Sequence, residues 1–191
     1  MIRGTSANPD TYFQSREATN PWYNAVYDHV EQAMNDFSAA TGRQYQPFEY
    51  YGHPQAPERV IILMGSAIGT CEEVVDELLT RGEKVGVLKV RLYRRFTAKH
   101  LLQALPGSVR SVAVLDRTKE PGAQAEPLYL DVMTALAEAF NNGERETLPR
   151  VIGGRYGLSS KEFGPDCVLA VFASSTRLNR KRALRLVFTM M

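Results

Sequence analysis

The sequence predicts an α/β fold: a three-layer sandwich in which helices cover both faces of a mostly parallel sheet. Short apolar runs alternate with helical patterns from residue 59 onward, and this order is typical of parallel α/β folds. The runs are apolar throughout, as expected for strands that are covered on both faces. At 191 residues the chain is long enough for one substantial domain with flanking segments.

The first 57 residues are predicted to precede this domain. Residues 3–14 are polar and contain the turn signal Asn8-Pro9-Asp10, so we expect them to bury little. A helix is predicted from Asn20-Pro21 to Thr41-Gly42, because asparagine can cap it, proline suits its first position and apolar residues recur at helical spacing. Residues 45–57 contain three prolines and are interpreted as an extended linker.

The alternation that follows predicts a sheet with right-handed crossovers. Thr70 and Glu73 have the spacing of a capping box at the start of the first helix. After residue 172 the pattern gives way to a basic stretch without strand or capping signals. The predicted strands are 60–64, 85–90, 111–115 and one that begins at 151–152, and the predicted helices are 70–82, 97–105, 127–140 and 168–172.

Composition excludes several classes of protein. The chain is 44% hydrophobic and 23% charged, as in ordinary globular proteins, and no apolar run approaches the roughly 20 residues that span a bilayer. Two cysteines, Cys71 and Cys167, make no disulfide framework and favour a reducing compartment, so we expect a cytoplasmic protein. The formal charge of +2 comes from the basic end of the chain, so we predict neither a nucleic-acid nor a membrane partner.

The first candidate site is the turn Gly65-Ser66-Ala67-Ile68-Gly69-Thr70, between a strand and a helix. Backbone N–H groups at such a position can hold a phosphate or a carboxylate. The turn lacks the Gly-x-Gly-x-x-Gly pattern and a following lysine, so a tight turn that only begins the helix is the alternative interpretation.

The second candidate is the loop that contains Arg117, Lys119 and Glu120, ahead of Pro121-Gly122. Its mixed charges suit an anionic ligand or a partner surface, and the alternative is a solvated turn. Both candidate loops follow parallel strands, so we expect them at the same edge of the sheet.

No metal site and no catalytic set is predicted. The three histidines share no close spacing with one another or with a cysteine, and no Gly-x-Ser-x-Gly motif occurs. Cys71 can have a lowered pKa in the first turn of a helix, or it can simply fill the core.

Several longer motifs follow one another in the order of a known family. The first motif is residues 3–14 together with Arg16-Glu17. The second consists of Gly65-Ser66, Gly69-Thr70 and Glu73. The remaining three are residues 85–96, 116–122 and 153–161. The first resembles the closing stretch of the first domain of pyruvate:ferredoxin (or flavodoxin) oxidoreductases, and the others resemble the second domain of that family and its exit.

The resemblance implies a domain similar to the C-terminal domain of transketolase, with a role between other domains. The parent enzyme would convert pyruvate and coenzyme A to acetyl-CoA and CO2, with thiamine diphosphate, magnesium and iron–sulfur clusters, and would pass electrons to ferredoxin or flavodoxin. These cofactors would lie in other domains. We therefore assign no catalytic residue here and expect the chain alone to be inactive. Arg117, Lys119 and Glu120 become candidates for contacts with neighbouring domains.

The resemblance also implies a domain organisation. Residues 1–21 would end a thiamine-diphosphate-type domain, 22–57 would form the linker helix and linker, 58–160 the α/β domain, and 161–191 the start of the next domain with an aberrant basic tail. Surfaces that faced other domains would make self-association of the fragment possible. The alternative function is a self-standing module that binds a phosphorylated ligand at 65–70.

Two features depart from the family pattern. The family usually has Arg-Pro-Phe where this chain has Arg94-Arg95-Phe96. The tail after Phe172 does not continue the pattern, and we interpret it as the product of a frameshift or mistaken truncation. A basic nucleic-acid-binding tail is the competing hypothesis.

Overall fold

The computed structural model describes residues 6–176 and 186–187 of the chain. The chain divides into two compact units, Met1–Pro47 and Phe48–Met191. The predicted basic tail falls almost wholly outside the described residues. None of the described helices is both long and apolar enough to cross a bilayer.

The first unit contains two helices, α1 (Pro9–Glu17) and α2 (Asn20–Thr41). The expectation that Asn8-Pro9-Asp10 marks a turn is wrong, because Asn8 caps α1: its side chain accepts a hydrogen bond from the Thr11 N–H at 2.8 Å. The predicted helix from Asn20 to Thr41 is confirmed, but the predicted capping role of Asn20 is wrong. Thr19 precedes the helix, no side chain caps it, and Asn20 is its first residue. The helix ends at Gly42, which adopts φ +73° and donates its N–H to the Ser38 carbonyl.

The second unit is built around a sheet with strand order β1-β3-β2-β4-β5-β6. Strand β1 is antiparallel to β3, and the other pairs are parallel. The mostly parallel sheet predicted from the sequence is therefore confirmed. Its elements are β1 (Phe48–Gly52), β2 (Arg59–Leu63), α3 (Ile68–Thr80), β3 (Val85–Val90), α4 (Ala98–Ala104), β4 (Ser111–Asp116), α5 (Pro127–Asn141), β5 (Arg150–Arg155), the 3₁₀ turn η1 (Leu158–Ser160), α6 (Pro165–Thr176) and β6 (Leu186–Val187).

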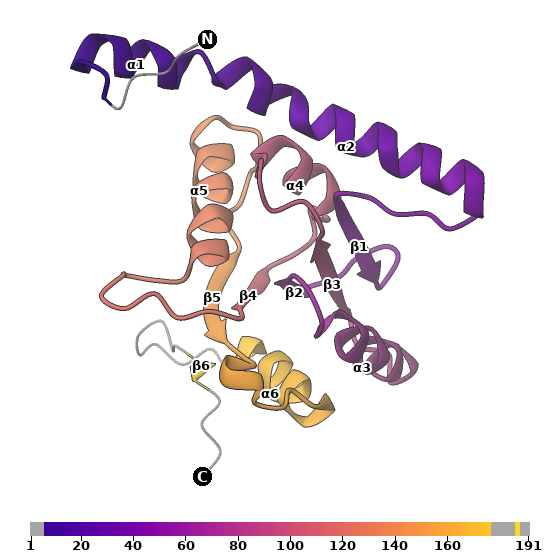
Figure 1. The fold of residues 1–191 in the computed structure, drawn as a ribbon. Coiled ribbons are helices and arrows are strands. Elements are labelled where there is room, and N and C mark those ends of the chain that lie inside the picture. Colours follow the sequence, from indigo (N-terminus) through magenta and orange to yellow (C-terminus); the bar gives the residue numbers. More distant parts are fainter. Residues whose placement is uncertain (1–5, 177–185, 188–191) are drawn as a thin grey trace. The chain divides into compact units, whose positions relative to one another are not determined.

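Helices cover both faces of the sheet (Figure 1). Helices α3 and α6 pack on one face, where Ile61 and Val87 belong to the same buried cluster as Cys71 and Val168. Helices α4 and α5 lie on the other face and contact each other. The connection after β3 runs back across β2 to β4, and the next connection continues from β4 to β5. Because right-handed crossovers are strongly preferred, this change of direction is expected to place α4 and α5 on the face opposite α3. The result is a three-layer sandwich.

Strand β1 corrects the linker interpretation of residues 45–57. Phe48 pairs with Val90 and Gly52 pairs with Gly86, so the segment extends the sheet by one edge strand. Its prolines, Pro47 and Pro54, stand just outside the strand and remove no hydrogen bond from it. The prolines suggested a linker because composition alone does not show which strand would be available as a partner.

Helix α3 begins three residues earlier than the capping box predicts. Ala67 precedes the helix, and no side chain caps it, so the proposed capping role of Thr70 is wrong. Gly65 has φ +84° and accepts a hydrogen bond from the Ile68 N–H at 3.3 Å. This turn requires the positive φ of glycine, and it places the start of the helix ahead of Thr70 in the chain.

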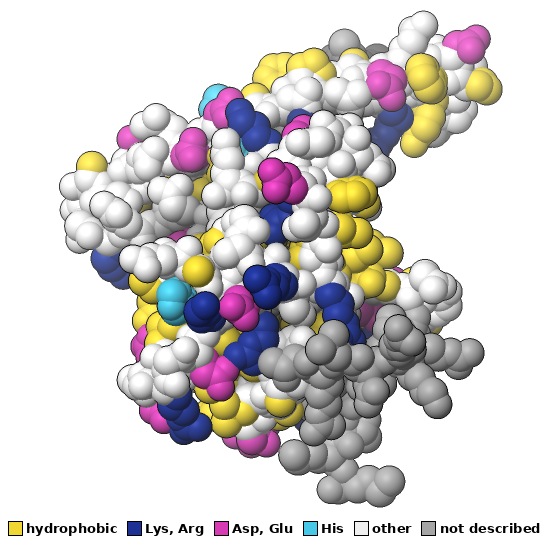
Figure 2. Space-filling view, turned by 180° about the vertical axis from the view of Figure 1, so that it is seen from behind, with side chains coloured by type: hydrophobic (Ala, Val, Ile, Leu, Met, Phe, Trp, Pro, Cys, Tyr) yellow, Lys and Arg dark blue, Asp and Glu magenta, His cyan; other side chains and the backbone are white. Residues whose placement is uncertain are grey.

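Helix α6 contributes Val168, Val171 and Phe172 to the main core. The compact unit therefore includes residues that the sequence assigns to the start of a following domain. The peptide bond between Arg94 and Arg95 is cis. Over the face in Figure 2, Lys and Arg side chains are interspersed with Asp and Glu.

Candidate functional site

The candidate site lies where the connections of the sheet change direction. Strands β2 and β4 are neighbours, and the chain leaves β2 toward β3 on one side and β4 toward β5 on the other. The loops after these two strands therefore diverge and leave a crevice between them. Open α/β sheets bind ligands at such switch points, outside the carboxyl ends of the strands.

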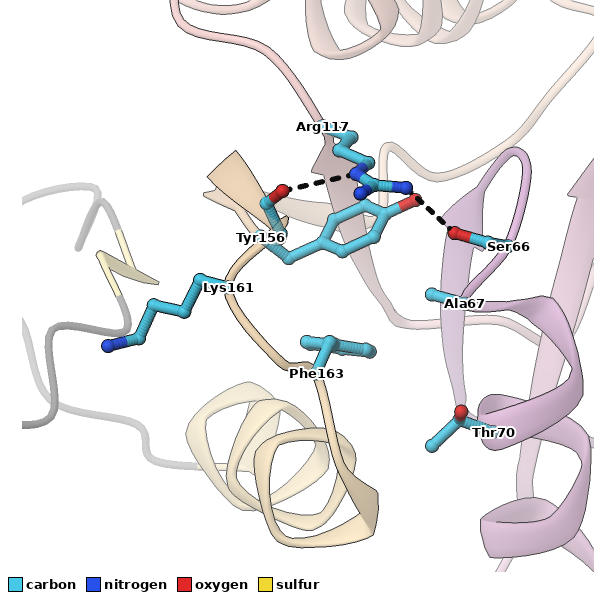
Figure 3. Close-up of a pocket in the computed structure, with 8 residues that line it drawn as sticks. Ser66, Ala67, Thr70, Arg117, Tyr156, Lys161 and Phe163 are labelled. Carbon is cyan, nitrogen blue, oxygen red and sulfur yellow. Dashed lines mark hydrogen bonds between the residues drawn. The ribbon is translucent and has the colours of Figure 1, made fainter. Parts of the chain in front are cut away.

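A small pocket of about 120 Å³ occupies this crevice (Figure 3). Its walls come from the β2–α3 loop, the start of the β4–α5 loop and the segment between β5 and α6. The lining residues are Ser66, Ala67, Thr70, Arg117, Tyr156, Gly157, Lys161 and Phe163.

Arg117 joins two of these walls. Its Nη1 donates a hydrogen bond to the Ser66 hydroxyl at 3.0 Å, and its Nε donates one to the Gly157 carbonyl at 3.1 Å. Gly157 has φ +60°, and a Cβ at this position would lie 3.0 Å from the Arg117 Nε. Glycine therefore permits both the backbone conformation and the close approach of the arginine.

The partners of Arg117 are neutral groups. Within the described residues, no carboxylate forms an ion pair with Arg117, whereas nearby Arg155 pairs with Glu126 at 3.0 Å in a buried position. The hydrogen bonds to the Ser66 hydroxyl and the Gly157 carbonyl satisfy two N–H donors of Arg117 but do not neutralise its positive charge. The pocket is therefore electropositive at Arg117.

Tyr156 and Phe163 form the apolar side of the pocket. Their ring centroids are 4.9 Å apart, and the buried Tyr156 hydroxyl donates a hydrogen bond to the Met64 carbonyl at 2.8 Å. Burial raises the pKa of Tyr156, and the nearby charge of Arg117 opposes this only in part. The phenol therefore stays protonated and serves as a structural donor rather than a base.

Asp116 is buried at the end of β4 and orients α5. Its carboxylate accepts the backbone N–H groups of Leu128 at 2.9 Å and Tyr129 at 3.2 Å, in the first turn of that helix. Burial raises the pKa of Asp116, although the two hydrogen bonds act in the opposite direction. Asp116 thus holds the scaffold beside the pocket and does not line it.

The structure brings together some of the predicted site residues and separates others. Ser66, Thr70 and Arg117 line one pocket, and the Arg117–Ser66 hydrogen bond confirms that the two loops meet at the same edge. Gly65 shapes the loop with its positive φ, Gly69 lies in the first turn of α3, and neither lines the pocket. Lys119 and Glu120 are exposed and lie outside the lining.

The backbone of Glu120 helps to fix its loop. Its N–H donates a hydrogen bond to the Glu126 carboxylate at 2.8 Å. Sequence reasoning missed Tyr156, Gly157, Lys161 and Phe163 as site residues. The glycine-rich run 153–157 indicated that another group could lie close to the backbone there, as Arg117 does at Gly157. Nothing in the sequence indicated Phe163.

The pocket offers hydrogen-bond donors, and the described residues of its lining include no histidine, cysteine or carboxylate that could activate its hydroxyl groups. Among the described residues no group of three potential ligands is placed to hold a metal ion. Cys71 is fully buried, and burial raises its pKa to about 12. A lowered pKa is therefore the wrong interpretation of Cys71, and its alternative role in the core is confirmed.

Fold and pocket together define an α/β domain with a switch-point crevice. The family model described as pyruvate:ferredoxin oxidoreductase core domain II matches residues 57–157, which is more than half of the chain. The chain belongs to this family, and the resemblance seen in the sequence is confirmed.

Curated relatives carry the name of the whole enzyme. The probable pyruvate-flavodoxin oxidoreductase of Escherichia coli K12 is 98% identical over 173 residues, and the pyruvate-flavodoxin oxidoreductase of Trichormus variabilis is 59% identical over 172 residues. These matches cover 91% and 90% of this chain but only 15% and 14% of the relatives. The chain therefore spans about a seventh of the length of these relatives.

A solved structure supports the fold. The 2-oxoglutarate:ferredoxin oxidoreductase of Magnetococcus marinus aligns with a TM-score of 0.55 at 16% identity, over 90% of this chain and 24% of that one. At this identity the likeness concerns the fold alone. It confirms that the α/β architecture occurs within a 2-oxoacid oxidoreductase.

Proposed function

We propose that this chain is a supporting domain of a pyruvate:flavodoxin or pyruvate:ferredoxin oxidoreductase and has no catalytic activity of its own. The parent would convert pyruvate and coenzyme A to acetyl-CoA and CO2 and deliver electrons to flavodoxin or ferredoxin. The observation that carries this proposal is 98% identity to a relative of which the chain covers only 15%.

The chemistry of the pocket agrees with a role that is not catalytic. Decarboxylation of a 2-oxoacid needs an electron sink, and electron delivery needs redox centres. The pocket has donors and an apolar wall, and the described residues of its lining include neither a histidine, a cysteine nor a carboxylate. Thiamine diphosphate, magnesium, iron–sulfur clusters and the coenzyme A site would therefore belong to other domains, and the setting would be the cytoplasm.

The exposed aromatic side chains of the first unit support contacts with other domains. Trp22 is 79% exposed, and Tyr12, Phe13 and Tyr23 are each more than half exposed. Large exposed apolar side chains on neighbouring helices are typical of surfaces that a partner covers. In the proposed parent, neighbouring domains would cover them, and the isolated chain would self-associate through them.

An assay of the isolated chain tests this proposal. The full 191-residue chain is mixed with pyruvate, coenzyme A, thiamine diphosphate, Mg²⁺ and an oxidised viologen dye, and reduction of the dye is followed under anaerobic conditions. We expect no reduction, while the full-length Escherichia coli relative serves as the positive control. Turnover by the isolated chain would overturn the proposal.

The alternative is a self-standing module whose function is to bind a phosphorylated ligand at residues 65–70. The placement of Ser66, Thr70 and Arg117 around one pocket favours it. Calorimetry distinguishes the two proposals. Micromolar or tighter binding of coenzyme A or thiamine diphosphate by the chain alone would favour the self-standing module. Weak or no binding would favour the supporting domain.

A further inference from the structure

We propose that the pocket at the switch point binds the phosphate group of a small phosphorylated molecule, with Arg117 as the charged contact and the Ser66 and Thr70 hydroxyls as neutral contacts. This goes beyond the supporting role proposed above, since a domain that catalyses no step can carry such a site. The inference depends on the geometry of the pocket and on the pairing of the charges around it.

The guanidinium of Arg117 has capacity left for a ligand. A guanidinium carries five N–H donors, and the described hydrogen bonds of Arg117 go to Ser66 and Gly157. Both partners are neutral, and both hold the side chain in place at the pocket. A phosphate would supply the missing negative charge and accept two parallel hydrogen bonds, the arrangement in which arginine binds phosphate best.

Two hydroxyls stand on the α3 side of the same pocket (Figure 3). The Ser66 oxygen accepts a hydrogen bond from Arg117, so its own proton is available to a second acceptor. Thr70 also lines the pocket with its side chain. One guanidinium and two hydroxyl donors suit a group with several acceptor oxygens better than a planar carboxylate, which has only two.

The remaining walls restrict what is attached to the phosphate. The volume of about 120 Å³ accommodates a phosphate and little more. Ala67 and the packed rings of Tyr156 and Phe163 form an apolar wall beside it. The part of the ligand next to the phosphate is therefore small and uncharged.

No carboxylate is present among the described residues of the lining. Asp116 directly precedes Arg117, but its buried carboxylate is directed at the first turn of α5, where it accepts two backbone N–H groups, and it does not line the pocket. Lys161 lines the pocket, and its ammonium group points away from Arg117 in Figure 3, so its contribution is a weaker, longer-range attraction. Lys119 lies on the same loop as Arg117 but outside the lining, which makes it a matched control.

The test is a titration of the full ¹⁵N-labelled chain with sodium phosphate, followed by ¹H–¹⁵N NMR at constant ionic strength maintained with sodium chloride. We expect saturable shifts of the Ser66 and Thr70 amides and a dissociation constant on the order of 1–10 mM, as for a minimal ligand. Glycerol 3-phosphate is expected to bind at least as tightly as phosphate. Shifts that grow linearly without saturation would overturn the proposal.

Variants identify the contacts. Arg117→Ala should weaken phosphate binding about 10-fold or more, because a hydrogen-bonded charge is lost, and Lys119→Ala should leave the dissociation constant within about twofold. Arg117→Lys keeps the positive charge but cannot donate two parallel hydrogen bonds, so its dissociation constant should lie between those of the wild type and Arg117→Ala. Equal weakening by Arg117→Ala and Lys119→Ala would show nonspecific attraction and overturn the proposal.

Two further measurements test the hydroxyl contact and the identity of the anion. Arg117→Ala also removes the link between two loops, so Thr70→Ala provides a variant that leaves this link intact. It should weaken binding by about two- to tenfold, the range for one neutral hydrogen bond, and an unchanged dissociation constant would count against the contact. Sodium acetate is the competing anion: binding as tight as that of phosphate would assign the pocket to carboxylates and refute the phosphate assignment.

Discussion

Lys89 offers the sharpest test of how this domain is held together. It is the penultimate residue of β3, its side chain is only 5% exposed, and its Nζ contacts the carboxylates of Glu49 on β1 and Glu72 on α3. The distance to Glu72 is 2.8 Å. Arg91 also pairs with Glu49, so two cations and two anions join the edge strand, its neighbour and a helix.

Replacing Lys89 by methionine keeps most of the side-chain volume and removes the charge. Breaking a fully buried ion pair costs about 3–5 kcal/mol, because the remaining charge is left without a partner. Here water reaches the remaining acids, since Glu49 is 27% and Glu72 is 31% exposed. We therefore expect a loss of about 2 kcal/mol in the free energy of unfolding, roughly a 30-fold change in the equilibrium constant.

The effect should depend on pH through Glu49. Burial alone would raise the pKa of Glu49, but hydrogen bonds from Lys89 and Arg91 outweigh it and hold the pKa below its ordinary value of 4.5. A carboxyl whose pKa is lowered by folding stabilises the native state above the unfolded pKa and loses this contribution as pH falls through the folded pKa. The difference between wild type and Lys89→Met should therefore be full at pH 7 and shrink below about pH 4.5.

Urea unfolding of the full chain, followed by far-ultraviolet circular dichroism at pH 7 and at pH 3.5, measures both quantities. The control is Arg81→Met, which removes an exposed pair with Glu77 in which the side chains are 60% and 58% exposed. This control should lose less than about 0.5 kcal/mol. The reasoning is refuted if Lys89→Met is as stable as wild type at pH 7, or if the two variants lose equal stability.

Three further predictions concern a thiol, a strained loop and a close backbone contact. Burial raises the pKa of Cys71 to about 12, so iodoacetamide at pH 8 should modify the half-buried Cys167 in the native chain and leave Cys71 unmodified, as read by mass spectrometry. Ser159 adopts φ +50° beside the pocket, and Ser159→Gly should raise the free energy of unfolding by about 0.5–1 kcal/mol because glycine tolerates this conformation. Gly52→Ala would place a Cβ 2.4 Å from the Gly86 Cα at φ +145°, and urea unfolding should show a loss of about 3 kcal/mol or more.

Each of these predictions has a distinct contrary result. Equal labelling rates for the two cysteines in the native chain would show that Cys71 is not enclosed. Ser159→Val should be destabilising, so a stabilising valine would exclude backbone strain as the cause. Gly107→Ala is the control for the close contact, because Gly107 has no heavy atom within 4 Å of an added Cβ. Equal losses for Gly107→Ala and Gly52→Ala would contradict the steric argument.

The central strands and the family could be predicted from the residues alone. Strands β2, β3 and β4 are apolar runs whose residues are almost all buried, and burial on both faces requires every side chain in such a run to be apolar or paired. The long helix α2 could also be predicted, because its apolar spacing and its final glycine agree with the structure, although its N-terminal residue Asn20 does not cap it. The order of these elements was enough to place the two candidate loops at one edge of the sheet.

The edge strand and the identity of the pocket residues depend on tertiary structure. Strand β1 exists because β3 offers a free edge, and an edge strand needs little apolar character of its own. Arg117 and Lys119 are both cations on one loop, but only Arg117 meets Ser66 and Gly157 across the crevice. Such contacts join residues about 40 or more positions apart, so they depend on how the strands are ordered in space, a property that no local pattern of residues contains.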